Sequence, residues 1–185
     1  MLAVSRSILC LLAISSGATA AAEHARPVGA TGVKTVIVVR HAEVEAGPHG
    51  GDPALSAAGK ARAAELARVL VDAPLTSVYA THFQRNRMTA AALPRRAGQA
   101  SVEPKVIDDV QGTLRALRAE PWGATTVVVG HSNTIGELLR GLTGRPIPDE
   151  PILFDRMWVV TVARDGSSSL LRLHYGAPVP VPDAP

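Results

Sequence analysis

Three short apolar runs, each followed by a segment with helical spacing, constrain the fold of this chain more than any other feature. The runs are Thr35–Val39, Ser77–Ala80 and Thr125–Val129, and each is partly β-branched. Short runs of this kind are typical of strands that are buried on both faces of a sheet. Because strands and helices alternate, we expect an α/β three-layer sandwich, in which helices flank a mostly parallel sheet.

Four helices are predicted between and after these strands, on the basis of apolar positions at helical spacing and of capping residues. Their predicted ranges are Ser56–Val71, Gln84–Leu93, Val106–Ala119 and Thr134–Leu142. The pattern then changes near the end of the chain. Met157–Ala163 and Leu170–Tyr175, joined through Asp165-Gly166, are predicted to form a C-terminal hairpin.

A length of 185 residues fits one well-packed domain. We place this domain at residues 34–175, after a flexible lead-in at 21–33 and before a Pro-rich tail at 176–185. Residues 1–20 have the layout of a cleaved signal peptide: Arg6, then a short apolar stretch, then small residues. The stretch is shorter than the roughly 18 residues of a membrane span. We therefore expect a periplasmic or secreted mature chain without a transmembrane anchor.

The composition argues against several classes of function. The single cysteine, Cys10, lies in the predicted signal peptide, so the mature domain would have no disulfide and no thiol nucleophile. A net charge of only +3, an aromatic content of 3% and the lack of a Lys/Arg run argue against a nucleic-acid partner. The chain has no His-Glu-x-x-His motif and no carboxylate cluster at ligand spacing, so we expect neither a metal nor another cofactor.

Basic side chains follow all three predicted strands. In an open parallel sheet, the functional crevice lies beyond the carboxyl ends of the strands. Arg40-His41 follows the first strand, Thr81 to Arg85 follows the second, and Gly130-His131-Ser132-Asn133 follows the third. Two imidazoles and two guanidinium groups are therefore predicted to meet at one edge of the sheet.

Such a cluster favours an anion over a metal, and phosphate is the natural candidate. Arg40 and Arg85 can grip phosphate oxygens bidentately, and the amides that open the helix after His131 add the positive end of a dipole. We expect Ser132 or Asn133 to cap that helix.

A neutral imidazole aimed in line at a phosphoryl group can attack phosphorus. His41 is the candidate nucleophile because it follows the strand directly and lies beside Arg40, whose charge is expected to hold the imidazole deprotonated. His131 would then donate a hydrogen bond to the phosphoryl group. The sequence therefore predicts a metal-independent phosphatase that acts on a small phosphorylated substrate or a phosphoprotein through a phosphohistidine on His41.

These motifs resemble those of the histidine phosphatase superfamily, the phosphoglycerate mutase-like fold, in its small bacterial branch. Arg40–Glu43 resembles the Arg-His-Gly signature, with Ala42 in place of the glycine. Leu55–Gly59 resembles the Leu-Thr-x-x-Gly helix entry, Val78–Ala90 the second-arginine segment, and Val129–Thr134 the second-histidine segment. The resemblance covers nearly all of the predicted domain in the right order.

The resemblance implies that His41 accepts the phosphoryl group and that Arg40, Arg85 and His131 form the phosphate pocket. It also implies a carboxylic acid that protonates the leaving group, as in larger members of the family. The candidates are Glu103, Asp108 and Asp109, which lack the family's surrounding motif, and Glu43, which is close to His41 in sequence. Protonation contributes about 10²–10⁴-fold for an alkyl phosphate, whereas an aryl phosphate or a phosphoramidate needs it less.

Two other functions stay open. A serine hydrolase would use Ser132, because Val127–Thr134 is close to the Gly-x-Ser-x-Gly elbow and Asp155 and His174 follow in the order of such enzymes. Against this, Thr134 stands where the elbow needs glycine, and the basic residues after the first two strands are left unexplained. A non-catalytic phosphate-binding module would keep the pocket without turnover.

Three other basic residues lie close to these motifs in sequence. We expect Arg62, on the first predicted helix, and Arg87, on the second, to lie on solvated helix faces. His82 is expected to be either an ordinary loop histidine or part of the mouth of the site.

Overall fold

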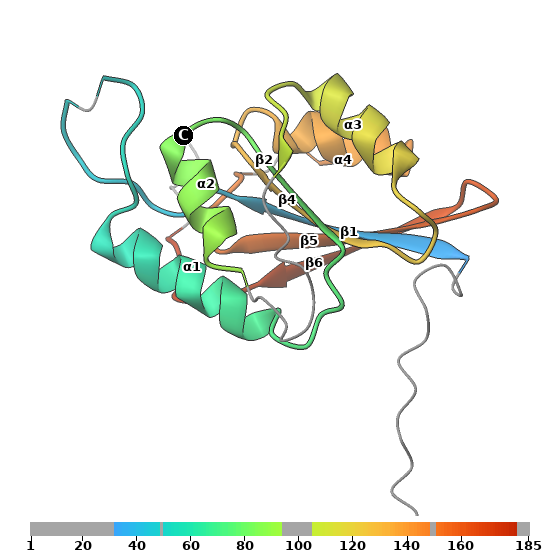
Figure 1. The fold of residues 1–185 in the computed structure, drawn as a ribbon, viewed down its shortest axis with the longest axis horizontal. Helices are drawn as coiled ribbons and strands as arrows, with labels where there is room; N and C mark the ends of the chain where they lie inside the picture. The colour runs from blue at the N-terminus through green and yellow to red at the C-terminus, as the bar shows by residue number, and fades with distance from the viewer. Residues whose placement is uncertain (1–31, 49, 94–104, 149–150, 181–185) are drawn as a thin grey trace, which may run out of the picture.

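The computed structural model describes residues 32–48, 50–93, 105–148 and 151–180. The predicted signal peptide, nearly all of the lead-in, the end of the tail and Glu103 lie outside these ranges. Within them, the elements in chain order are β1 (Val33–Arg40), α1 (Ala57–Val69), β2 (Ser77–Ala80), α2 (Gln84–Ala91), β3 (Lys105–Val106), α3 (Val110–Ala119), β4 (Thr125–Gly130), α4 (Ile135–Thr143), β5 (Arg156–Ala163) and β6 (Ser168–His174) (Figure 1). None of the helices in the described ranges is long and apolar enough to cross a membrane.

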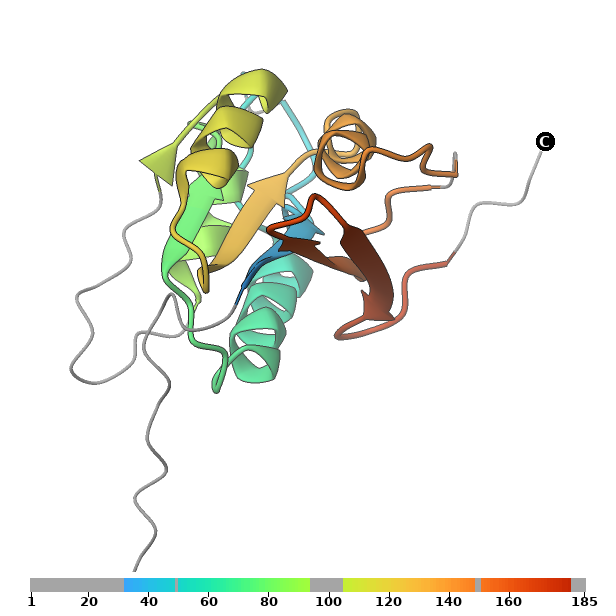
Figure 2. The same cartoon turned by 90° about the vertical axis from the view of Figure 1, so that its right-hand side faces the viewer.

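The strands form one sheet with the order β3-β2-β4-β1-β5-β6. The first three neighbouring pairs are parallel, and the pairs β1–β5 and β5–β6 are antiparallel. The parallel arrangement is thus confirmed for the three apolar runs, although the sheet as a whole is mixed. The predicted C-terminal hairpin is also confirmed, and it forms one edge of the sheet (Figure 2). Gly166, with a φ of 83°, allows the tight turn between its strands.

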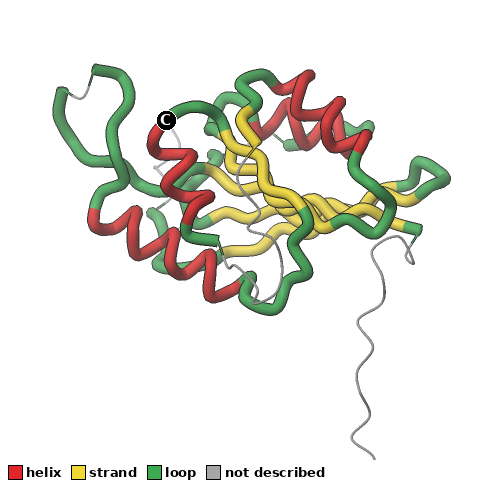
Figure 3. The backbone as a smooth tube through the Cα atoms, viewed as in Figure 1, coloured by secondary structure: helices red, strands yellow, loops and turns green. Residues whose placement is uncertain are grey.

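Helices cover both faces of the sheet, as Figure 3 shows. Strand β1 contributes to two cores because successive side chains point to opposite faces. Ile37 and Val39 pack on the side of α1 and α2, whereas Val36 and Val38 pack on the side of α3 and α4. This double burial explains why the run is continuously apolar, and it confirms the predicted sandwich.

The predicted helix at Val106–Ala119 is wrong at its start. Val106 belongs to the short edge strand β3, which pairs with β2, and α3 begins only at Val110. The cap of α3 is Asp109, whose carboxylate accepts a hydrogen bond from the N–H of Gly112. Pairing at the sheet edge therefore takes residues that local helical spacing assigned to the helix.

The loop that follows β1 is held against the first turn of α1. The N–H of Ser56 donates to the carbonyl oxygen of Glu43 at 3.0 Å, and Val44 and Leu55 form an isolated antiparallel bridge. Gly59 lies so close to this loop that an added Cβ would overlap the Glu43 carbonyl group. A glycine is therefore required here by close approach, and the contact fixes the backbone two residues after His41.

We expect Gly59→Ala to lower the free energy of unfolding by about 1–3 kcal/mol, because either the loop or α1 must move to admit the methyl group. Gly136→Ala is the matched control: its Cβ would meet only the flexible end of Arg140, at 3.5 Å, in the interior of α4. The control should be neutral or stabilising by up to about 1 kcal/mol. Urea denaturation measures both, and equal stability of the two variants would contradict the close-packing argument.

Candidate functional site

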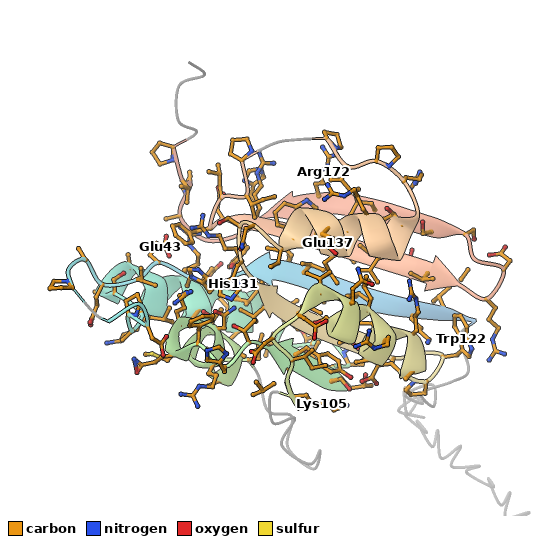
Figure 4. The ribbon with its side chains drawn as sticks, turned by 90° about the horizontal axis from the view of Figure 1, so that it is seen from above. Glu43, Lys105, Trp122, His131, Glu137 and Arg172 are labelled. Carbon is orange, nitrogen blue, oxygen red and sulfur yellow. The ribbon has the colours of Figure 1, made fainter. Side chains whose placement is uncertain are left out.

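The predicted site residues converge at the carboxyl ends of β1, β2 and β4. Arg40, the last residue of β1, pairs with Gly130 of β4, and the N–H of His41 donates to the Gly130 carbonyl oxygen at 3.0 Å. The rings of His41 and His131 lie with their centroids 5.3 Å apart and their planes at 66°. Figure 4 places His131 at this end of the sheet and Trp122 at the opposite end. The two imidazoles therefore face a common space.

The hydrogen bonds of His41 determine which ring nitrogen is free. Its Nδ1 lies 2.8 Å from the carbonyl oxygen of Ala42, and a carbonyl oxygen only accepts. In the neutral ring, Nδ1 therefore carries the proton and Nε2 keeps a free lone pair. Ala42 is itself fixed, because its N–H donates to Thr89 Oγ1 at 3.0 Å and its side chain is fully buried. A small residue suffices at this position.

Burial keeps both imidazoles of the site neutral. The pKa of His41 falls from 6.5 to about 4, chiefly through loss of solvation, with smaller lowering by the charges of Arg40 and Arg85. The pKa of His131 also falls to about 4, again chiefly through burial and then through the same two guanidinium groups. The charge of Arg40 therefore contributes to deprotonation of His41, as expected, but burial is the larger cause. Both rings are neutral at pH 7.

The chain has two phenylalanines, and each stacks on one arginine of the site. The guanidinium carbon of Arg40 lies 3.9 Å from the ring centroid of Phe154, and that of Arg85 lies 4.3 Å from Phe83. A stacked guanidinium is held in one plane while its N–H groups point sideways toward a ligand. Each phenylalanine also lies close to a histidine of the site: the ring centroids of Phe154 and His41 are 5.8 Å apart, and those of Phe83 and His131 are 5.4 Å apart. Sequence reasoning missed both rings, although their rarity was a usable signal.

Both arginines keep donors available for a ligand. One terminal nitrogen of Arg40 donates to the carbonyl oxygen of Ile152 at 2.9 Å, while the buried Nε has no hydrogen-bond partner among the described residues. Arg85 donates to the Gly51 carbonyl oxygen at 3.3 Å and lies 3.7 Å from Asp52 Oδ1. A buried donor without a partner costs free energy, which an anion in the site would offset.

Helix α2 is anchored directly to the ends of β1 and β4. The side chain of Asn86 is fully buried and donates to the carbonyl oxygens of Val129 and Gly130, at 2.9 and 3.3 Å. The Thr89 hydroxyl donates to the carbonyl oxygen of Arg85 at 2.8 Å. These contacts fix the backbone that carries Arg85. Sequence reasoning did not assign a role to Asn86 or Thr89, because these roles depend on non-local contacts.

His131 is oriented by two threonines. Its Nε2 lies 2.9 Å from Thr81 Oγ1, so Nδ1 is the ring nitrogen that can reach a ligand. The Thr134 hydroxyl accepts from the N–H of His131 and donates to its carbonyl oxygen. The expected cap by Ser132 or Asn133 is wrong, because the N-cap of α4 is Thr134 and its hydroxyl bonds back to His131 instead of to the helix.

Arg62 is buried, with 6% of its surface exposed, so the expectation of a solvated position is wrong. Its Nε donates to both carboxylate oxygens of Glu43, at 2.8 and 3.0 Å, and its terminal nitrogens donate to the carbonyl oxygens of Tyr175 and Ala177. Arg62 thus joins α1, the loop after β1 and the C-terminal segment. Arg87 lies on an exposed face of α2, as expected.

The carboxylates considered as proton donors are engaged elsewhere. Glu43 is held by Arg62, and Asp109 caps α3. Asp108 accepts hydrogen bonds from His82, which lower the pKa of its carboxyl group. Glu103 lies outside the described residues. A carboxyl group with a lowered pKa is a poor proton donor at neutral pH, so Asp108 is not a direct acid.

The residues of a serine triad are not brought together. Asp155 and His174 do form a hydrogen bond of 3.0 Å, but His174 lies on β6. Strand β6 is three strands from β4, after which Ser132 follows, and this separation is about 14 Å at ~4.8 Å per strand. Within the described residues, Ser132 is exposed and makes no side-chain hydrogen bond, and no group of three His, Cys, Asp or Glu side chains is arranged to hold a metal ion.

Comparison with known proteins gives a match to one family model and solved structures of the same fold. The model of the histidine phosphatase superfamily (branch 1) matches residues 36–109. A SixA protein from Nakamurella multipartitia superposes with a TM-score of 0.61 at 21% identity, over 80% of this chain and 99% of that chain. The protein histidine phosphatase SixA, solved with tungstate, superposes with a TM-score of 0.61 at 19% identity, over 76% of this chain and 96% of that chain. A mycobacterial glucosyl-3-phosphoglycerate phosphatase superposes with a TM-score of 0.54 at 14% identity, over 75% of this chain and 97% of that chain. The search of curated proteins found no match.

We expect the stability of the fold to decrease as the pH is lowered from about 6.5 to about 4. In this range the unfolded chain protonates His41 and His131, whereas the folded protein, with both pKa values near 4, does not. The unfolded state then binds more protons, so the free energy of unfolding rises with pH. The loss from His41 at pH 5 is about 1–2 kcal/mol.

Urea denaturation at pH 7 and pH 5 measures this effect. The double variant His41→Gln, His131→Gln should lose less stability between the two pH values than the unaltered protein. The same pH dependence in both proteins would show that neither imidazole has a lowered pKa.

Proposed function

We propose that this protein, whose resemblance to the histidine phosphatase superfamily is confirmed by the family match and the fold, is a phosphohydrolase that forms a phosphohistidine on His41. The substrate is a phospho-monoester or a phosphoramidate, carried by a small molecule or by a phosphoprotein. The observation that carries the proposal is a neutral, buried imidazole with a free Nε2, which faces a second imidazole between two stacked guanidinium groups.

In the first step, the lone pair on Nε2 of His41 attacks phosphorus, and the bond from phosphorus to the leaving group breaks, at oxygen in a phospho-monoester and at nitrogen in a phosphoramidate. The charge on the equatorial oxygens is balanced by Arg40 and Arg85. His131 donates a hydrogen bond to the same oxygens from Nδ1, in the tautomer in which the Thr81 hydroxyl donates to Nε2. Two fixed positive charges thereby supply the electrostatic stabilisation that many phosphatases obtain from a metal ion.

In the second step, a water oxygen attacks phosphorus from the side that the leaving group has vacated. The phosphorus–nitrogen bond breaks, inorganic phosphate is released, and His41 returns to its neutral state. The protein histidine phosphatase SixA, which has the same fold, was solved in complex with tungstate. Tungstate, like phosphate, is tetrahedral and anionic, and this supports the proposal of a phosphorylated substrate.

We also propose that residues 1–20 direct export of the chain to the periplasm or the medium. N-terminal sequencing of protein recovered from the periplasmic fraction should give a start near residue 21, and deletion of residues 1–20 should leave the chain in the cytoplasm. Recovery of the intact N-terminus in the cytoplasm would exclude export.

We expect His41→Ala to lower the rate of phosphate release from an aryl phosphate by at least about 1000-fold, because the nucleophile is lost. Arg85→Ala should lower kcat/KM by about 10²–10³-fold, because one guanidinium no longer stabilises the transition state. Arg87→Ala, an exposed residue on the same helix, is the matched control and should keep full activity. Release of the aryl alcohol in the presence of excess chelator measures all three.

Each competing function gives a different result in these assays. Full activity of His41→Ala would exclude the phosphohistidine mechanism. Vanadate should inhibit the enzyme as a phosphate mimic, whereas inhibition by a fluorophosphonate would instead support the serine hydrolase. Phosphate binding without turnover would identify a binding module.

A further inference from the structure

The proposed reaction needs a proton for the leaving oxygen, and Glu43, Asp108 and Asp109 are each engaged by other groups. We propose that His82 is the catalytic acid and base of this site and that Asp108 is its positioning residue. This inference rests on the proposed function and names the group that transfers the proton in both of its steps.

Asp108 holds His82 at two points. Its Oδ1 accepts from the backbone N–H of His82 at 2.9 Å, and it lies 2.9 Å from the ring nitrogen Nδ1. Because the carboxylate accepts from Nδ1, the other ring nitrogen, Nε2, is free to exchange a proton. A carboxylate in this position also fixes the tautomer and the orientation of the imidazole ring. Asp108 thus holds His82 in one orientation, with Nε2 available for proton transfer.

The ring of His82 lies beside the phosphate pocket. It stacks on Phe83 with a centroid separation of 4.1 Å, and Phe83 in turn contacts both Arg85 and His131. His82 and Asp108 also act on the pKa of His131, which His82 lowers and Asp108 raises. Both groups are therefore within electrostatic range of the site.

The pair is exposed to solvent on the side of Phe83. The side chains of His82 and Asp108 are 58% and 55% exposed, so His82 can exchange protons with solvent between turnovers. A cavity of about 30 Å³ is lined in part by Asp108, Thr81 and Gly130. This is room for about one water molecule. A water molecule can thus be placed beside Asp108.

One residue can serve both steps. As Nε2 of His41 attacks phosphorus, the Nε2 proton of charged His82 moves to the leaving oxygen, which departs as a neutral alcohol. Neutral His82 then takes a proton from water while the water oxygen attacks phosphorus and the phosphorus–nitrogen bond breaks. His82 is charged again at the end, so the cycle balances without a further reactant.

The test is a series of substituted phenyl phosphates, which differ in leaving-group acidity and little in size. His82→Gln should lower kcat/KM for unsubstituted phenyl phosphate by about 100-fold, and by less than about threefold for 4-nitrophenyl phosphate, whose leaving group needs no proton. The plot of log kcat/KM against leaving-group pKa should therefore be steeper in this variant. Asp108→Asn should give an intermediate slope, a change that a purely structural role would not produce.

His174→Gln is the matched control, because His174 forms the same kind of hydrogen bond with Asp155 but lies on β6, two strands from β1. It should keep the slope of the unaltered protein. An equal loss on all substrates in His82→Gln, or no loss on any, would overturn the role of His82 while leaving the phosphohistidine mechanism intact. If the unaltered protein hydrolyses none of the series, the proposed function fails and this inference fails with it.

Discussion

The parallel register between β1 and β4 determines whether this protein has a site at all. Arg40 pairs with Gly130, so the residues that follow, His41 and His131, leave the sheet side by side. A slip of one residue would exchange the two faces of a strand and place the side chains of each core on the wrong side. The apolar contacts on both faces of the central strands therefore hold the two imidazoles together.

The site concentrates positive charge in a place where burial makes charge costly. Arg40 and Arg85 each rest on an aromatic ring, and both lower the pKa values of His41 and His131. Loss of solvation adds to this effect, so the nucleophile stays neutral without a neighbouring base. The same environment favours a bound anion, which restores the charge balance and gives the buried Nε of Arg40 a partner.

Position in the fold separates residues that look alike in sequence. His82–Asp108 and His174–Asp155 are both hydrogen-bonded histidine–carboxylate pairs, but the first joins the segments that follow β2 and β3, whereas the second joins β6 to the residue before β5. Arg62 was expected in solvent, yet it is buried against Glu43, because the C-terminal segment folds back over α1. Side-chain chemistry suggests what a residue can do, and only the tertiary contacts show whether it is in a place to do it.

By itself, the sequence determined the three central strands, the order of the helices and the side chains that follow each strand. These features depend on local periodicity and on the rule that parallel strands share one carboxyl edge, so they were predictable. The tertiary structure decided the start of α3, the antiparallel pairing of the predicted hairpin with β1, and the stacking of Phe83 and Phe154 on the arginines. Each of these results from contacts between residues far apart in the chain, which leave no periodic signal in any one segment.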